Sequence, residues 1–171
     1  MSAPAPDVVR PLAGWPAPLS AIILAAWVGA TLYFSVVVTR AAFAVLPTRT
    51  LAGALVGRTL PILFDTGMLV GAILVGAALL SPPVAARTAS LAGGVVIFLV
   101  TALARFVILA RIDRLRTAMP SAIDSLPVTD PSRRAFGLLH AMSVGALGLA
   151  LLVGIVVIIV LAHSLSVAAH D

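Results

Sequence analysis

The ionisable residues inside apolar stretches are the first candidates for chemistry in this chain. Asp65 lies within the run "RTLPILFDTGMLVGAILVGAALL", residues 58–80, Arg105 lies near the end of a second apolar run, and His140 lies near the start of a third. A carboxylate, a guanidinium and an imidazole can form ion pairs, bind an ion or exchange a proton. These three residues are therefore the candidate site, provided that the surrounding elements bring them together.

The composition identifies the chain as an integral membrane protein. Hydrophobic residues make up 61% of the sequence and charged residues only 10%, with a mean hydropathy of +1.19, whereas soluble domains are about 25% charged. All 11 cations are Arg, all 6 anions are Asp, and Cys is absent, which excludes disulfides, thiolate metal sites and Cys nucleophiles. The net charge of +5 does not indicate nucleic acid, because the Arg residues flank apolar spans and few aromatics are available for base stacking.

Four apolar segments are long enough to cross a bilayer, which requires about 20 residues each. They cover residues 19–38, 60–80, 88–110 and 137–162. The predicted fold is all-α, an integral membrane four-helix bundle that forms a single transmembrane domain over residues 19–163. The other predicted segments are a Pro-rich extension 1–18, a long connection 111–135 and a short tail 164–171.

Two connections contain helix-start signals. Thr48 is a predicted N-cap for a helix through 49–57 that either lies at the membrane interface or continues into the second span. Asp130 is a predicted N-cap of the last helix, with Pro131 at its first position, where the missing N–H is harmless.

The distribution of Arg predicts the orientation, because cytoplasmic loops are rich in Arg and Lys. With Arg105 set aside as intramembrane, the side of the termini carries only Arg10 and Arg87. The other side carries Arg40, Arg49, Arg58, Arg111, Arg114, Arg116, Arg133 and Arg134. We therefore expect a multi-pass protein of the bacterial inner membrane with both termini extracytoplasmic, and cytoplasmic Arg loops that can contact anionic lipids.

With this topology Asp65, Arg105 and His140 fall at about one depth, roughly 7 Å inside the cytoplasmic ends of three spans. Charges within a membrane are rare and usually face a partner or a cavity. We expect the three side chains to face inward and satisfy one another as an intramembrane polar layer. Possible contributors are Arg40, Arg58 and Ser143. The layer is either a structural clamp or a place where a ligand, ion or proton binds; alternatively, Arg105 extends to the headgroups.

No enzyme or cofactor signature is present. The chain has no G-x-S-x-G, no phosphate-binding Gly loop ahead of a Lys and no H-E-x-x-H. Weak metal candidates are His140, Met68 and Met142, since thioether and imidazole suit copper, but they lack ligand spacing. We therefore expect no enzyme activity, no metal and no cofactor.

Two stretches resemble a known family. They are "WVGATLYFSVVVTRAAFAVLPTRTLAGALVGRTLP", 27–61, and "FGLLHAMS", 136–143. Together with four spans, they make residues 20–162 similar to the bacterial four-helix membrane family of unknown function related to eukaryotic transmembrane protein 205. The positions carried over are Phe43, Leu46, Pro47, Gly53, Gly57, Arg58, Pro61, Phe136, His140 and Ser143. The chain departs from the family pattern by its lack of Asn and by Asp65.

The resemblance implies the fold and the membrane location but no established reaction. Our first hypothesis is a non-enzymatic accessory or interaction subunit, acting as a homo-oligomer or within a larger membrane complex. The alternative is a small carrier or channel-like oligomer for a metal ion, proton or small solute, which a more distant likeness to copper-resistance membrane proteins of the D type also suggests. A redox-complex subunit is the weakest of the three hypotheses.

Overall fold

The computed structural model describes residues 16–81, 85–118, 126–127 and 129–168. Residues 1–15 of the predicted extension, 119–125 and 128 of the long connection, and 169–171 of the tail lie outside the described residues. The described chain is helical apart from short connections, so the predicted all-α fold is confirmed.

Four long helices account for the four predicted spans. The first consists of α1 (Pro16–Tyr33), a π-helical turn η1 (Phe34–Val38) and α2 (Thr39–Val45); the second is α3 (Arg49–Leu80). The third consists of α4 (Ala85–Leu103), the π-helical turn η2 (Ala104–Ile108) and α5 (Leu109–Thr117); the fourth is α6 (Pro131–Ala168). Each is long and apolar enough to cross a membrane, which confirms the four spans.

The helices extend beyond the predicted apolar spans. The largest extension is at the start of the second helix, which begins at Arg49 rather than near residue 60. The last helix likewise continues through Ala168 into the segment expected to be a tail. An apolar run marks only the part of a helix inside hydrocarbon, and a helix that satisfies its own backbone can continue through the headgroups into water.

Both helix-start signals act as expected. The Oγ1 atom of Thr48 accepts a hydrogen bond from the Leu51 N–H at 3.2 Å, and α3 then runs without a break into the second span. The Asp130 carboxylate accepts from the Ser132 N–H at 2.7 Å, with Pro131 as the first residue of α6. Side-chain acceptors here satisfy amides that have no partner within the helix.

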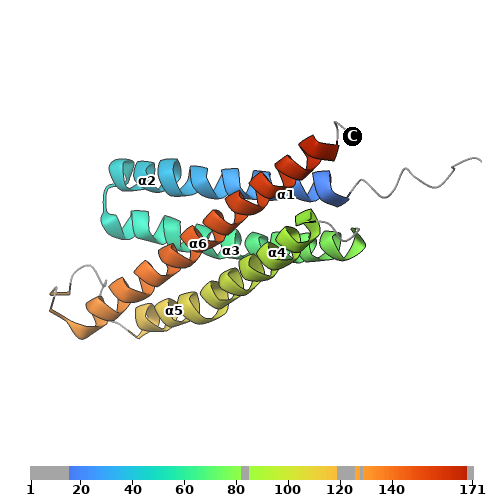
Figure 1. Cartoon of the computed structure of the whole chain (residues 1–171). Helices are drawn as coiled ribbons and strands as arrows, with labels where there is room; N and C mark the ends of the chain where they lie inside the picture. Colours follow the sequence, from blue (N-terminus) through green and yellow to red (C-terminus); the bar gives the residue numbers. More distant parts are fainter. Residues whose placement is uncertain (1–15, 82–84, 119–125, 128, 169–171) are drawn as a thin grey trace, which may run out of the picture.

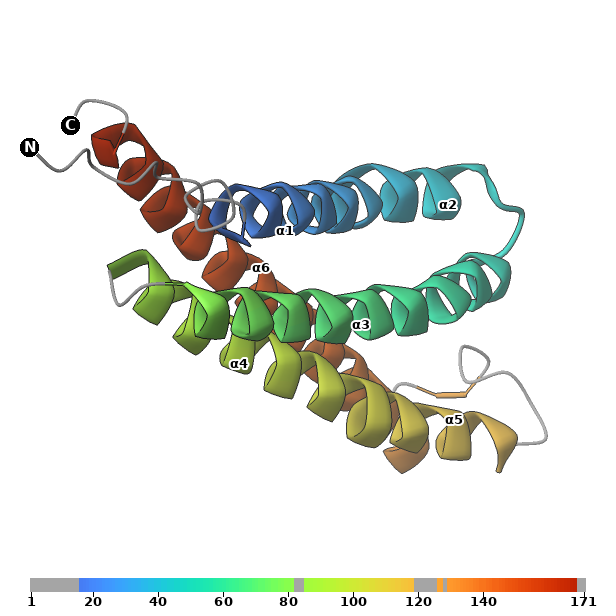
Figure 2. The ribbon, with the colours of Figure 1, turned by 90° about the vertical axis from the view of Figure 1, so that its right-hand side faces the viewer.

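The bundle has two distinct ends. Figure 2 places the α2–α3 connection and the end of α5 at one end, which we call the loop end, and the start of α1 with the ends of α3 and α6 at the other, the terminus end. The most extensive contact joins α3 and α4, while α6 crosses the bundle diagonally and packs against α4 and α1 (Figures 1 and 2). The eight Arg residues assigned to one side by sequence all lie on helical segments toward the loop end.

Two clusters of buried side chains form the core, one toward each end. The cluster toward the terminus end includes Leu24, Trp27, Leu74, Ile97 and Leu161. The cluster toward the loop end includes Phe34, Phe64, Ala104, Ile108 and Leu147. The remaining large apolar side chains cover the outer surface of the helices, as expected for a protein surrounded by lipid.

Candidate functional site

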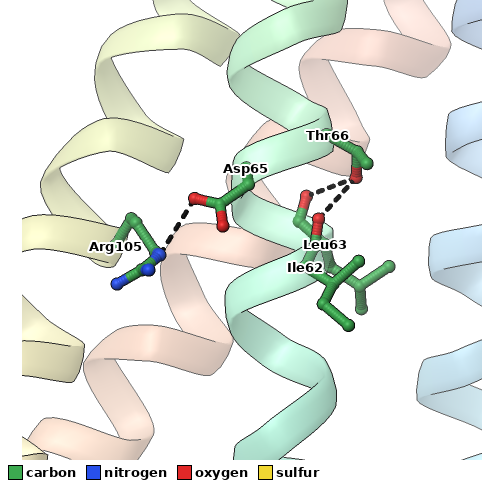
Figure 3. Close-up of polar contacts among 5 residues, drawn as sticks. All are labelled: Ile62, Leu63, Asp65, Thr66 and Arg105. Carbon is green, nitrogen blue, oxygen red and sulfur yellow. Dashed lines mark hydrogen bonds and ion pairs between the residues drawn. The ribbon is translucent and has the colours of Figure 1, made fainter.

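Asp65 and Arg105 form an ion pair between the second and third helices. The Arg105 Nε donates to Asp65 Oδ1 at 2.9 Å, and Figure 3 shows the two side chains pointing toward each other from neighbouring helices. Asp65 lies on α3 and Arg105 on η2. The predicted pairing of these two residues is thus present in the structure.

The pair meets because α3 and α4 pack backbone to backbone. A Cβ at Gly71 would lie 2.7 Å from the Gly94 carbonyl oxygen, and a Cβ at Gly94 would lie 2.8 Å from the Gly71 oxygen. One turn closer to the loop end, a Cβ at Gly67 would lie 2.8 Å from the Thr101 methyl group. These glycines fix the register of the two antiparallel helices, so that Asp65, two residues before Gly67, lies opposite η2.

The pair lies on the outer surface of the bundle, so the expectation that Asp65 and Arg105 face inward is wrong. The neighbours Phe64 and Ala104 are fully buried in the core, so the adjacent residues on each helix point away from it. The Arg105 side chain is 35% exposed and that of Asp65 is 49% exposed. The surface beside them is apolar, with Ile62, Leu69 and Phe106 exposed. Two charges with unused hydrogen-bonding capacity therefore face outward amid apolar side chains.

His140 contacts a different set of residues. Its ring stacks on Phe136 with centroids 6.2 Å apart and an interplanar angle of 8°, and its side chain lies exposed on α6. Ser143 is buried, and its hydroxyl donates to the His140 carbonyl at 2.8 Å. Within the described part of the chain no hydrogen bond or ion pair joins the imidazole to the Asp65–Arg105 pair, so its membership of one polar layer stays a prediction.

Arg116 makes contacts that the sequence analysis did not identify. Its guanidinium lies over the Phe136 ring at 5.3 Å from the centroid. It also occupies the space beside Gly57, where a Cβ would lie 2.8 Å from Nη1. Arg116, Phe136 and His140 thus form a column that joins α5 to α6 next to α3. The signal in the sequence was Gly57, which stands one turn before Pro61 and leaves room for a bulky neighbour.

The remaining candidates stay dispersed. Arg40 and Arg58 are exposed near the loop end, on α2 and α3. Met68 is half-buried on α3, and Met142 is exposed on α6. Among the described residues, no group of three or more His, Asp or Glu side chains gathers that could hold a metal ion.

A buried hydrogen bond joins the first and second helices. Trp27 Nε1 donates to the Leu63 carbonyl oxygen at 3.2 Å. One turn along α1, Thr31 is fully buried, and its hydroxyl has no hydrogen-bond partner among the described residues. Indole N–H groups usually require an acceptor when buried, so Trp27 was a recognisable candidate for this role, although the sequence did not indicate its partner.

Four apolar helices with an ion pair on their outer surface define a multi-pass membrane bundle. A family model described as a domain of unknown function (DUF4149) matches residues 22–121, more than half of the 171-residue chain, so the chain belongs to this family. The expectation of a family of unknown function is confirmed at this level. The matched range includes Asp65 and Arg105 but ends before His140. No curated protein and no solved structure matches the chain.

Proposed function

We propose that this chain is a non-enzymatic accessory or interaction subunit of the bacterial inner membrane, which acts by binding other membrane-embedded helices. The observation that carries the proposal is the outward-facing ion pair of Asp65 and Arg105. A charged residue inside hydrocarbon costs about 2.5–3.5 kcal/mol even on insertion scales. The ion pair between Asp65 and Arg105 offsets only part of this cost, because both side chains are still partly exposed to hydrocarbon. A polar group on a helix of another protein would offset the rest.

The position of the pair favours assembly over transport. A conduction path through a single bundle requires polar groups that line its interior. In this bundle the pair faces outward, and buried hydroxyls such as those of Thr101 and Ser143 bond to carbonyls of their own helices. The same geometry gives no specific support to a carrier for a metal ion, proton or solute, or to a redox subunit.

The proposal includes an orientation. The Arg-rich loop end would lie in the cytoplasm, where its arginines contact anionic lipid headgroups, and both termini would be extracytoplasmic. The proposed evolutionary relation to eukaryotic transmembrane protein 205 rests on the motifs in 27–61 and 136–143.

The test is the size of the complex that contains the chain in native membranes. After gentle detergent extraction, we expect the 17.4 kDa chain to migrate in a complex larger than a monomer. Asp65→Ala and Arg105→Ala should each reduce that complex, whereas Ile159→Ala, at an exposed apolar residue on α6, should not. A monomeric chain with stoichiometric metal or a haem absorbance band would contradict the proposal.

A further inference from the structure

The surface around Asp65 and Arg105 combines three properties. The charges lie about 7 Å inside the apolar part of α3, by helical rise from its predicted start near Leu60. Within the described residues, their hydrogen bond uses only Nε and Oδ1, so the terminal guanidinium nitrogens and Oδ2 are left for another partner. The large apolar side chains of Ile62, Leu69 and Phe106 are exposed beside them. A partner at this surface must therefore be membrane-embedded and must present both charges or a strong dipole.

We infer that the partner at this face is a second copy of the same chain, and that two Asp65–Arg105 pairs close into a ring of four charges. This inference rests on the proposed function and names the occupant of its binding surface. The second copy meets the requirement directly, because it presents the same carboxylate and guanidinium at the same depth.

Two-fold symmetry makes the arrangement electrostatically complementary. Two copies with the same topology in one membrane are related by an axis along the membrane normal, and such an interface places the same patch of each copy opposite itself. The pair points from α3 to η2 across the surface, so a rotation of 180° reverses it. Asp65 then faces the partner's Arg105, and Arg105 faces the partner's Asp65. Each charge gains a second opposite charge and no like charge as its nearest neighbour.

The backbone of α3 can also approach closely on this face. Ala72 and Gly76 follow Asp65 by about two and three helical turns and are exposed, and a Cβ at Gly76 would meet nothing within 4 Å. By contrast, Gly67 and Gly71 already pack against α4, so they are not available for contact with a second chain. Small residues at helix surfaces permit the close contact by which membrane helices associate.

The decisive experiment uses a charge-reversed chain that carries Asp65→Arg and Arg105→Asp. This chain keeps an ion pair within itself and keeps complementarity with its own copy, so it should fold and dimerise. In a mixed dimer, position 65 of the reversed chain faces Arg105 of the wild-type chain, so like charges meet. We expect co-expressed, differently tagged chains to form both homodimers, with the mixed dimer at least about tenfold below its statistical share.

A mixed dimer at the statistical share, half of all dimers when the chains are equally expressed, would overturn the inference, as would monomers of both chains. If either result were obtained and the chain still formed a larger complex with a different protein, the inference of a dimer would fail but the proposed function would stand. If the chain were found in no complex at all, with itself or with another protein, both proposals would be overturned.

A second measurement uses the absence of Cys, because one introduced Cys is then the only thiol. Gly76→Cys places a thiol on the proposed interface without a steric clash. Under a thiol oxidant in membranes it should cross-link into a dimer. Ile159→Cys, on an exposed face of α6, is the matched control and should not. Equal cross-linking of the two variants, or cross-linking of the control alone, would contradict the interface.

Discussion

At the scale of single residues, the main feature is a salt bridge placed where neither water nor a packed core surrounds it. Surface salt bridges in water contribute little, because solvent already stabilises each charge. Within hydrocarbon the separate charges are far less stable, so the same 2.9 Å contact between Asp65 and Arg105 has a larger effect. We therefore expect each of the two residues to stabilise the protein mainly through its contact with the other, and less through contacts with the rest of the bundle.

A double-mutant cycle tests that dependence. Asp65→Ala and Arg105→Ala should each lower thermal stability in detergent or lipid, because each leaves one unpaired charge. The double change should be less harmful than the sum of the singles, with a coupling of about 1 kcal/mol or more. Strict additivity of the two single changes would show that the pair does not stabilise the fold.

Removal of the polar group should have different effects on stability at Trp27 and at Thr31. Trp27→Phe removes the bond to the Leu63 oxygen and should destabilise the protein by about 1 kcal/mol or more. Thr31→Val removes a buried hydroxyl that has no partner among the described residues, so it should be neutral or stabilising. Thermal unfolding of both variants in one detergent provides the comparison, and a loss of stability for both would mean that the Thr31 hydroxyl also has a partner.

At the scale of elements, the glycine contact between α3 and α4 determines which face of each helix points outward. Gly67, Gly71 and Gly94 bring the two backbones together and turn Asp65 and Arg105 to the edge of that contact. The direction of the ion pair is thus a consequence of glycine positions on the same two helices, from two residues away (Gly67 from Asp65) to eleven residues away (Gly94 from Arg105).

Two glycines on α3 provide a matched pair of substitutions. Gly71→Ala places a methyl group 2.7 Å from the Gly94 oxygen and 2.8 Å from the Phe98 nitrogen, so it must separate the helices and should cost about 1–3 kcal/mol. Gly76→Ala meets nothing within 4 Å and should leave the stability of the monomer unchanged or slightly raised. The melting temperature of each variant tests this, and a similar loss for both would argue against the backbone contact.

The sequence was sufficient for the elements and for the ion pair, but not for the direction of the pair. Apolar runs and capping residues such as Thr48 and Asp130 are local signals, and opposite charges at matching depth on neighbouring spans indicated that Asp65 and Arg105 would meet. The rotation of each helix depends on contacts with other helices, which no local pattern contains. For the same reason the stacking of Arg116 on Phe136 and the ring contact of His140 were not predicted.

At the scale of the whole molecule, charge is concentrated at one end of an otherwise apolar bundle. Eight Arg residues lie toward the loop end. The two ends of the bundle are therefore unequal, and the membrane insertion machinery can distinguish them by the excess of positive charge.

Reporter fusions test the expected orientation. A reporter that is active only outside the cytoplasm should function at the C-terminus, and one that is active only inside should function when inserted between α5 and α6. Replacing several arginines of α5 and the start of α6 by Ser should increase the fraction of inverted molecules. Termini found in the cytoplasm would contradict the orientation and with it the proposed lipid contacts.

The length of the helices has a consequence for how the protein sits in membranes of different thickness. With 38 residues, α6 is about 57 Å long, while the hydrocarbon layer is about 30 Å thick. Helices of this length do not by themselves determine how deeply they sit in the bilayer. Under the proposed orientation, the depth would be set by the eight arginines toward the loop end, through their contact with lipid phosphates. Asp65 and Arg105 would then keep a constant distance from that leaflet surface, and a thicker or thinner bilayer would change only what surrounds the opposite end.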